Sequence, residues 1–355
     1  MPISSQPKTN ATDASTSARV VYLSINAEDA GQRLDNYLLR VYKGVPKSHL
    51  YRILRSGELR VNSCRANAGY RLQVGDRLRI PPLRLPHRQP KPIERAESYV
   101  QLPVFHEDAA LLVVDKPAGL AVHGGSGVSF GVIELLRRQR PQSRFLELAH
   151  RLDRGTSGVL LLAKKRSVLS ALHAAFRGED ATLDKRYWLL VRGSWREPLR
   201  HVRASLVKTI NASGQRHVHI ATGRAGEAPP QTAHTVLRLL TNWSDYSLLE
   251  AQLKTGRTHQ IRVHLSHLGY PILGDEKYGD FALNKQLSGQ CLKRMALHAC
   301  KLQFKHPQSG EVMRFHSSMP TKLSHFINHL GPCVQGKEKL KEVLNAQSCQ
   351  ADVHE

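Results

Sequence analysis

A Pro- and Arg-rich stretch from Pro81 to Pro92 divides the chain into two parts of different texture. Such a composition is typical of a semi-rigid linker. The chain has 355 residues, more than one hydrophobic core usually serves. We therefore expect two unequal domains, a small one at residues 21–82 and a larger one at residues 99–330, with a linker at residues 83–98 between them.

The two ends are expected to lie outside these domains. Residues 1–20 are rich in Ser, Thr, Ala and Asn without an apolar region after basic residues, which predicts a disordered leader rather than a signal peptide. Residues 331–355 read as a polar tail, marginal to the fold. No apolar run approaches the roughly 20 residues that cross a bilayer. The five cysteines are scattered, as expected for reduced thiols, so we expect a cytoplasmic protein.

The charge is strongly basic, with 52 Lys and Arg against 29 Asp and Glu, a formal net charge of +23. A field of this sign attracts polyanions, so nucleic acid is the first partner to consider. The excess is concentrated near the N-terminus, where residues 31–95 contain 15 basic and 4 acidic residues. An ordinary basic enzyme is the alternative, and the pattern of elements decides between the two.

The small domain has the pattern of two helices followed by a hairpin. Apolar residues at helical spacing predict a first helix around residues 34–41, and a second should run from an N-cap at Ser48 to a stop at Gly57. Two short strands, at residues 58–62 and 76–80, follow. Basic side chains on this unit that would contact phosphates, unless they form only a solvated face, are Lys47, Arg52, Arg55 and Arg60.

This helix-plus-hairpin unit resembles the S4 RNA-binding domain. The resemblance is carried by Arg33-Leu34-Asp35, Ser48, Ile53, Gly57-Glu58, Val61-Asn62 and Gly75-Asp76. It implies a small α/β domain that binds RNA.

The larger domain alternates β-favouring apolar runs with helical segments. The expected strands include residues 110–114, 159–163, 187–191 and 247–253, and a helix is expected at residues 167–176. The order lacks regular βαβ alternation. This favours an α+β domain around a mixed sheet over a doubly wound parallel one.

A polar hinge separates two strand-like runs, residues 146–152 and 159–163. Within it, a carboxylate at Asp153 could be held rigidly at a sheet edge, while Arg151, Arg154 or a more distant Arg keeps it ionised. By residue types alone, a salt-bridged turn is the commoner structure. The longer string around the hinge changes that balance.

The string His150-Arg151-Leu152-Asp153 resembles the signature of the RluA family of pseudouridine synthases, in which this Asp is the catalytic carboxylate. Further motifs match in the family's order: Lys116-Pro117-Ala118-Gly119, Lys185-Arg186-Tyr187, Thr255 through His264, and Gly274-Asp275 through Tyr278-Gly279. The resemblance extends from about Gly31 to Leu330. Residues 43–48, 123–127 and 145–148 are most similar to the RluC-type branch, which acts on large-subunit (23S) ribosomal RNA.

The resemblance implies a pseudouridine synthase fold with a mixed, largely antiparallel sheet. It implies that Asp153 acts on a flipped-out uridine, either as a nucleophile or as the base that removes a ribose proton, and both routes stay open. Tyr187 would stack on the uracil and handle a proton. Arg262 would pair with Asp153, with Arg257 as the alternative.

The same resemblance implies RNA contacts at Arg151, Arg154, Arg257 and His259. Uridine isomerisation involves no net redox change, so no cofactor or metal is expected. Two departures from the family pattern are Gly155, where an acidic residue is common, and Trp188-Leu189, where smaller residues are usual. The second puts the packing beside Tyr187 in question.

Three rival interpretations were weighed. His259, His264 and His267 invite a metal site, but on a strand His259 and His264 would point to opposite faces. Ser157 with His150 and Asp153 suggests a hydrolase triad, although the spacing of a nucleophile elbow is absent. The rival from another class is a non-catalytic ribosome-assembly or RNA-chaperone protein. The absence of an interface stripe favours a monomer without an obligate protein partner.

Overall fold

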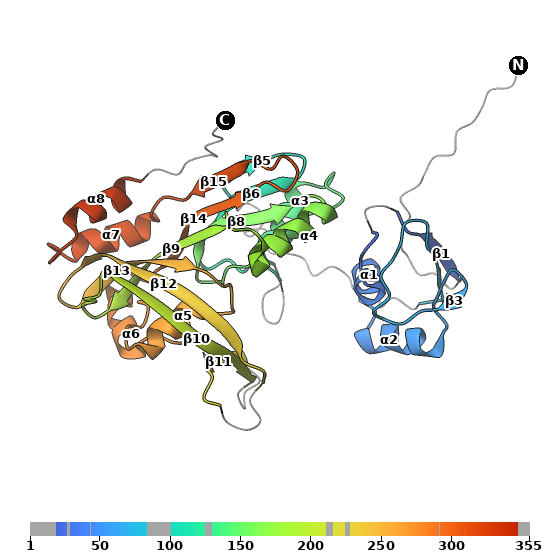
Figure 1. Cartoon of the computed structure of the whole chain (residues 1–355), viewed down its shortest axis with the longest axis horizontal. Coiled ribbons are helices and arrows are strands. Elements are labelled where there is room, and N and C mark those ends of the chain that lie inside the picture. Colours follow the sequence, from blue (N-terminus) through green and yellow to red (C-terminus); the bar gives the residue numbers. More distant parts are fainter. Residues whose placement is uncertain are drawn as a thin grey trace, which may run out of the picture. The chain divides into compact units, whose positions relative to one another are not determined.

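The computed structural model describes residues 19–26, 29–42, 44–83, 101–124, 130–210, 216–223, 228–290 and 292–346. The chain divides into two compact units, Met1–Tyr99 and Val100–Glu355 (Figure 1). Each unit is described by itself. The expected leader lies almost entirely outside the described residues, as does the linker.

The first unit is a small α/β domain with a four-stranded antiparallel sheet in the order β1-β4-β2-β3. Its elements are β1 (Val21–Ser24), α1 (Leu34–Val41), α2 (Lys47–Ser56), β2 (Arg60–Val61), β3 (Cys64–Arg65) and β4 (Arg77–Ile80). Apolar side chains from both helices and the sheet form one core, which includes Leu34, Leu38, Leu50, Ile53 and Leu78. This core holds the two helices against the sheet.

Local signals predicted this unit well, with one error. Helix α1 lies where the apolar spacing placed it, and α2 ends at Gly57, whose φ of 74° is the left-handed conformation that glycine adopts most readily. The expected N-cap at Ser48 was wrong. Helix α2 begins at Lys47 after Pro46, whose ring fixes φ and makes it a natural residue at a helix start.

The second unit is built on one sheet of eleven strands, with main order β11-β10-β12-β13-β9-β14-β8-β6-β5; β15 pairs with β14 and β7 with β8. Its strands are β5 (Val104–Glu107), β6 (Leu111–Lys116), β7 (Glu147–Leu148), β8 (Ser157–Ala163), β9 (Asp184–Arg192), β10 (Leu199–Ile210), β11 (Arg216–Ile220), β12 (Gln231–Asn242), β13 (Tyr246–Leu253), β14 (Leu297–Lys305) and β15 (Val312–His316). Among the strand pairs of the described residues, only β14–β8 is parallel. The expected mixed, largely antiparallel sheet is confirmed.

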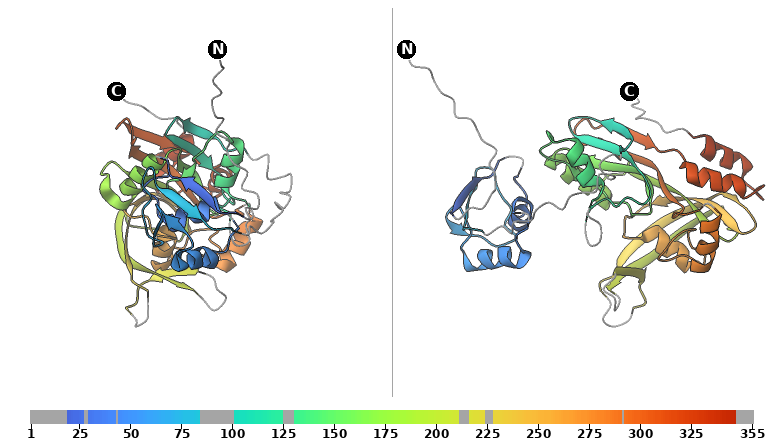
Figure 2. Two further views of the ribbon diagram at one scale, coloured as in Figure 1. Left: turned by 90° about the vertical axis from the view of Figure 1, so that its right-hand side faces the viewer. Right: turned by 180° about the vertical axis from the view of Figure 1, so that it is seen from behind.

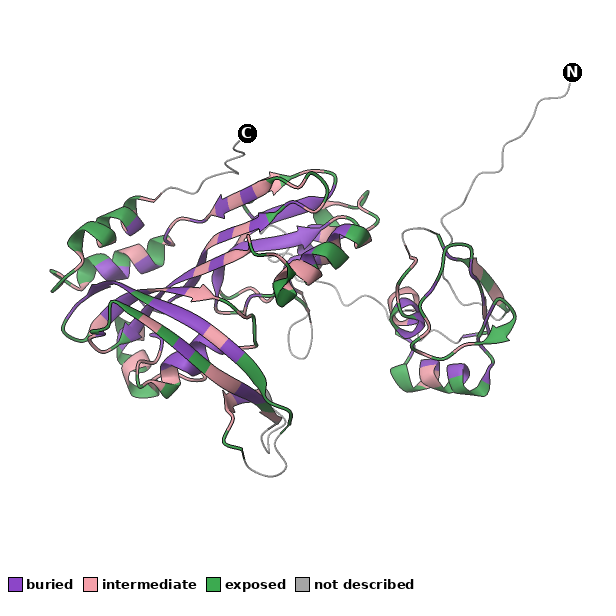
Figure 3. Ribbon diagram, in the orientation of Figure 1, coloured by how far each residue is buried: buried purple, intermediate pink, exposed green. Residues whose placement is uncertain are grey.

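Strand β14 joins the two halves of this sheet. It pairs antiparallel with β9 on one side and parallel with β8 on the other, although it lies far from both in sequence. Every residue of β8 is buried (Figure 3), which explains its unbroken apolar composition. Apolar clusters fill both faces of the sheet around these central strands.

Helices cover the sheet in separate groups (Figures 1 and 2). They are α3 (Val132–Gln139), α4 (Arg166–Ala174), which continues into a π-helical turn, α5 (Gln260–His267), α6 (Phe281–Gly289), α7 (Thr321–His329) and α8 (Lys337–Asn345). Helix α4 packs on β8, whereas α5 packs on β10, β11 and β12. Every helix in the described residues is too short or too polar to span a bilayer.

The segment expected to be a marginal tail is part of the fold as far as residue 346. The Trp243 indole donates to the carbonyl of Gly331 (3.0 Å), and Thr241 donates to that of Gln335 (2.5 Å). Helix α8 then packs on β12 and buries Val343. The composition of this segment is polar overall and predicted no helix in the fold. A helix with one narrow apolar face can still pack stably when that face lies against a sheet. Residues 347–355 lie outside the described residues.

Candidate active site

Asp153 lies in the short loop between β7 and β8. The Thr156 N–H donates to its carbonyl (3.1 Å), which tightens the loop just before β8 begins. Gly158 has a φ of 111°, and a Cβ there would lie 2.2 Å from the carbonyl oxygen of Ala299. Only glycine allows β8 and β14 to approach so closely at this point. The loop is thereby fixed to the sheet, while the Asp153 side chain stays 29% exposed.

Arg262, from α5, connects Asp153 to a second carboxylate. Its Nη1 donates to Asp153 Oδ2 (2.8 Å), while Nε and Nη2 form a bidentate pair with Asp275 (2.7 Å each). The Asp275 side chain is only 1% exposed and also accepts from the backbone N–H groups of Lys277 and Tyr278. Asp275 therefore orients the guanidinium, which presents its remaining edge to Asp153.

The contacts of Arg262 and Asp275 keep both side chains ionised. Burial alone would lower the pKa of Arg262, but the hydrogen bonds and charges of Asp275 and Asp153 raise it above its usual value. Burial likewise opposes ionisation of Asp275, and the contacts from Arg262 outweigh it, so the pKa of that carboxyl is lowered. Asp153 therefore faces a permanent positive charge at hydrogen-bond distance.

His259 lies on the other side of the Asp153 carboxylate. The Val218 N–H donates to the Tyr278 hydroxyl (3.1 Å), which lies 2.8 Å from His259 Nδ1. If the hydroxyl donates to Nδ1, the imidazole proton is on Nε2, which lies 3.8 Å from Asp153 Oδ1. The opposite tautomer would direct a lone pair at the carboxylate, so the contacts favour the Nε2–H form. Burial lowers the pKa of His259 and keeps it neutral, against the attraction of Asp153.

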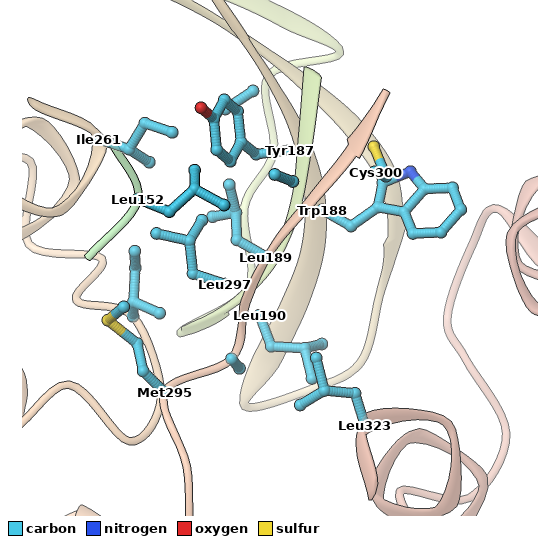
Figure 4. Close-up of a cluster of buried hydrophobic side chains, with 14 of the residues drawn as sticks. Leu152, Tyr187, Trp188, Leu189, Leu190, Ile261, Met295, Leu297, Cys300 and Leu323 are labelled. Carbon is cyan, nitrogen blue, oxygen red and sulfur yellow. The ribbon is translucent and has the colours of Figure 1, made fainter. Parts of the chain in front are cut away.

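Tyr187 projects from β9 into the same region and is 9% exposed. Figure 4 shows its ring beside Leu152 and Ile261, with the hydroxyl at the end away from the strand. Burial raises its pKa, and the negative charge of Asp153 adds to this effect. The phenol is therefore protonated at neutral pH.

Asp153 and Tyr187 line a common hollow of about 670 Å³, which we call the Tyr187 hollow. His150 in its wall is neutral, because burial and the charge of Lys185 lower its pKa to about 3. Burial also lowers the pKa of Lys185 to about 8, and its ammonium lies 5.5 Å from the centroid of the Phe176 ring. The hollow thus combines buried neutral groups, Tyr187 and His150, with Lys and Arg side chains in its lining.

A second hollow, of about 1230 Å³, adjoins the first. The two share Asp153, Arg154, His259 and Arg262 as lining residues. Lysine and arginine side chains from distant segments line it, and we call it the Lys293 hollow.

Lys116 supports the loop that separates the hollows. It is fully buried, and its ammonium donates to the carbonyls of Pro117, Leu120 and Arg154 (2.9, 2.7 and 3.3 Å). Burial, aided by the charge of Arg294, lowers its pKa to about 7. The sequence motif around Lys116 was noted, but its role was missed, because the carbonyl of Arg154 comes from a distant part of the chain.

The structure separates the candidate arginines. Arg262 contacts Asp153, whereas the Nε of the alternative, Arg257, donates to the carbonyl of Thr232 (3.1 Å). Arg151 and Arg154 are exposed at the rim of the Tyr187 hollow. Trp188 faces away from Tyr187 and packs edge-on against His316, so its bulk is accommodated on the other side of β9.

The basic residues expected to bind RNA in the first unit are exposed: Lys47, Arg52, Arg55 and Arg60. Arg52 pairs with Glu58 (3.3 Å), and Arg60 donates to the carbonyls of Gly57 and Ser63. Arg60 also lines a hollow of about 660 Å³ with Tyr22, Arg77 and other residues of this unit.

The strand expected at His259–His264 was wrong. His259 has a φ of 55° and precedes α5, where Gln260 to Leu265 are all buried. A helix buried on all sides lacks the periodicity that distinguishes it from a strand. Within the part of the chain that the structure describes, no group of three or more His, Cys, Asp or Glu side chains is placed to hold a metal ion.

Each of the two units matches the model of a known protein family. Residues 110–267 match the model of the RNA pseudouridylate synthase family, and residues 32–78 match the S4 domain. Of the solved structures, human RNA pseudouridylate synthase domain containing 4 is similar at 26% identity and a TM-score of 0.51, over 64% of this chain and 92% of that one. Human RNA pseudouridylate synthase domain containing 1 shares the fold, with 24% identity and a TM-score of 0.54 over 70% of this chain and 96% of that one.

Curated relatives are more similar. Ribosomal large subunit pseudouridine synthase C of Haemophilus influenzae is 45% identical over 314 residues, which cover 88% of this chain and 95% of the relative. The protein of the same name from Escherichia coli K12 is 45% identical over 88% of this chain and 97% of its own length. The chain therefore belongs to the RNA pseudouridylate synthase family.

Proposed function

We propose that this protein isomerises specific uridines to pseudouridine in large-subunit (23S) ribosomal RNA, with Asp153 as the catalytic carboxylate. The observation that carries the proposal is the Asp153 side chain, partly exposed in a hollow with a protonated Tyr187 and oriented by Arg262. The choice of RNA is supported by the names of two relatives, which are matched over 95% and 97% of their own length.

The reaction breaks the bond between N1 and the ribose C1′ and forms one between C5 and C1′, while the C5 proton is lost and N1 gains one. The target uridine first leaves its stack, at a cost of a few kcal/mol that RNA binding offsets. In the hollow, the Tyr187 ring would stack on the uracil and its hydroxyl would take part in the proton transfer at C5. Asp153, whether nucleophile or base, would act as a carboxylate that Arg262 orients through its hydrogen bond.

Arg151, Arg154, Arg257 and His259 would contact the RNA around the hollow. The exposed basic residues of the first unit, Lys47, Arg52, Arg55 and Arg60, would add phosphate contacts there. We also propose that the protein acts in the cytoplasm as a monomer. Its described cysteines, Cys64, Cys300 and Cys333, are free thiols, in keeping with a reducing compartment.

The test is the substitution Asp153→Asn, which keeps the size and polarity of the side chain but removes its charge. We expect pseudouridine formation in an unmodified transcript of large-subunit ribosomal RNA to fall by at least about a thousandfold, with the RNA dissociation constant little changed. Carbodiimide-primed stop mapping measures the product and names the target uridines. Full activity in this variant would remove the catalytic role from Asp153. No pseudouridine formation by the unaltered protein would favour the non-catalytic assembly factor instead.

A further inference from the structure

The Lys293 hollow has a marked excess of positive charge. Seven Lys or Arg side chains line it against three carboxylates, Asp115, Asp153 and Glu276. Two of the carboxylates are already bound within the protein, since Asp153 accepts from Arg262 and Asp115 accepts from Ser317 (3.0 Å). The hollow therefore keeps an excess of positive charge that attracts anions, although Asp115 interacts electrostatically with Arg294.

Several of these cations lack an acidic partner. Among the described residues, Arg154, Lys293, Arg294 and Lys322 have no carboxylate at ion-pair distance. Unpaired cations gathered around one concavity repel one another, and a polyanion would relieve that repulsion.

Arg294 is the best-defined member of the group. It is half-buried, and its guanidinium donates to Ser157 Oγ (2.6 Å) and to the carbonyl of Leu297 (3.2 Å). Ser157 is itself 2.9 Å from His298 Nδ1, so the anchor belongs to a connected network. Burial lowers the pKa of Arg294 to about 10, which still leaves it charged at neutral pH. A fixed, partly desolvated guanidinium is well suited to a phosphate oxygen.

We propose that the Lys293 hollow binds phosphate groups of the RNA strand next to the flipped nucleotide. This rests on the proposed function. The ligand class follows from continuity as well as charge, because the hollow shares Asp153, Arg154, His259 and Arg262 with the Tyr187 hollow. A strand whose base enters one hollow can continue across this shared rim into the other. Exposed Lys293 and Lys322 supply mobile charges, and Arg294 supplies a fixed one.

The test uses the full chain with Lys293→Gln and Lys322→Gln combined. Both side chains are exposed, so folding should be unaffected. The probe is an unmodified transcript of large-subunit ribosomal RNA, and its dissociation constant is measured across a range of salt concentrations. Each lost phosphate contact with a single strand reduces the slope of log K against log salt by about 0.7, so the double variant should lose about 1.4. At saturating RNA, kcat should be unchanged, because these contacts are made equally before and during the reaction.

Two controls make the result specific. Lys337→Gln combined with Lys339→Gln removes the same charge from exposed positions of α8, outside the hollow, and should leave the slope unaltered. Arg in place of Lys293 and Lys322 keeps the charge and should preserve the slope. An equal loss of slope in the α8 control would mean that the overall charge of the protein, rather than contacts in the Lys293 hollow, causes the effect, which would contradict the proposal. No loss of slope in the Lys293→Gln and Lys322→Gln variant would also overturn it.

Product formation in the same samples separates this inference from the proposed function. If the unaltered protein binds the transcript without forming pseudouridine, the proposed function fails, while the salt slopes still decide whether the Lys293 hollow contacts phosphates.

Discussion

The Tyr187 hollow and the Lys293 hollow meet at Asp153, and Lys and Arg side chains line both, but the two hollows differ in the groups beside these cations. In the first, burial keeps His150 neutral and Tyr187 protonated. In the second, cations gather without carboxylate partners. One shared carboxylate thus borders a surface suited to an uncharged base and a surface suited to a charged backbone. An RNA-modifying enzyme must both react with a base and bind phosphates, and we propose that each hollow serves one of these two functions.

The strongest way to break this comparison is Tyr187→Phe. Loss of the hydroxyl removes a group proposed for proton transfer, so kcat should fall by about a hundredfold, while the affinity and salt slope stay those of the unaltered protein. Single-turnover pseudouridine formation and salt-dependent binding measure the two effects. The Lys293 and Lys322 variants should show the opposite pattern. A Tyr187→Phe protein that loses affinity and keeps kcat would show that the two hollows are not divided in this way.

The neutrality of His150 predicts a pH effect on stability. Its pKa is about 3 in the folded protein and about 6.5 when unfolded. The unfolded state therefore binds a proton first as pH falls below 6.5, so acidification favours unfolding until pH 3. Between pH 7 and pH 5 this histidine alone should cost about 2 kcal/mol of unfolding free energy.

The measurement is urea unfolding followed by tryptophan fluorescence. All three tryptophans, Trp188, Trp195 and Trp243, lie in the second unit, so the signal reports that unit alone. His150→Gln removes the titrating group and should lose less stability than the unaltered protein over the same pH interval. Equal losses in both proteins would mean that His150 is not held neutral.

The smallest expected effect concerns Tyr278, whose hydroxyl contacts His259 at the shared rim. Tyr278→Phe removes the hydrogen bonds to Val218 and His259, so His259 would no longer be held in one tautomer facing Asp153. A single hydrogen bond contributes about 1 kcal/mol, which corresponds to a roughly fivefold lower kcat. Nitrogen-15 shifts of the His259 imidazole should report the released tautomer. Unchanged shifts would remove Tyr278 from the site.

The sequence predicted those features whose causes are local. Helix α1 follows from apolar spacing, and the end of α2 from the left-handed conformation of Gly57. The strands around residues 110–114, 159–163, 187–191 and 247–253 follow from β-favouring apolar runs, and all four are confirmed. The catalytic assignment of Asp153 did not follow from its neighbours, and it depended on family motifs spread along the chain.

The features that the sequence did not reveal depend on contacts between distant segments. Nothing near Asp275 indicates that it orients Arg262, and the choice between Arg262 and Arg257 required the fold. The same holds for the three carbonyls around Lys116 and for α8, whose apolar face gains its meaning only against β12. Local sequence patterns predict secondary structure, whereas a site depends on residues that are distant in sequence and close in the fold.

The position of β14 has a consequence for the newly made protein. Asp153 precedes β8 and Tyr187 lies on β9, and in the described sheet β14, which is made much later, lies between these two strands. A growing chain that has not yet released residues 297–305 from the ribosome already contains Asp153 and Tyr187 but lacks the strand that lies between β8 and β9. Pairing over such long separations is slow. The proposed active site can therefore assemble only after β14 has been synthesised, long after Asp153 and Tyr187.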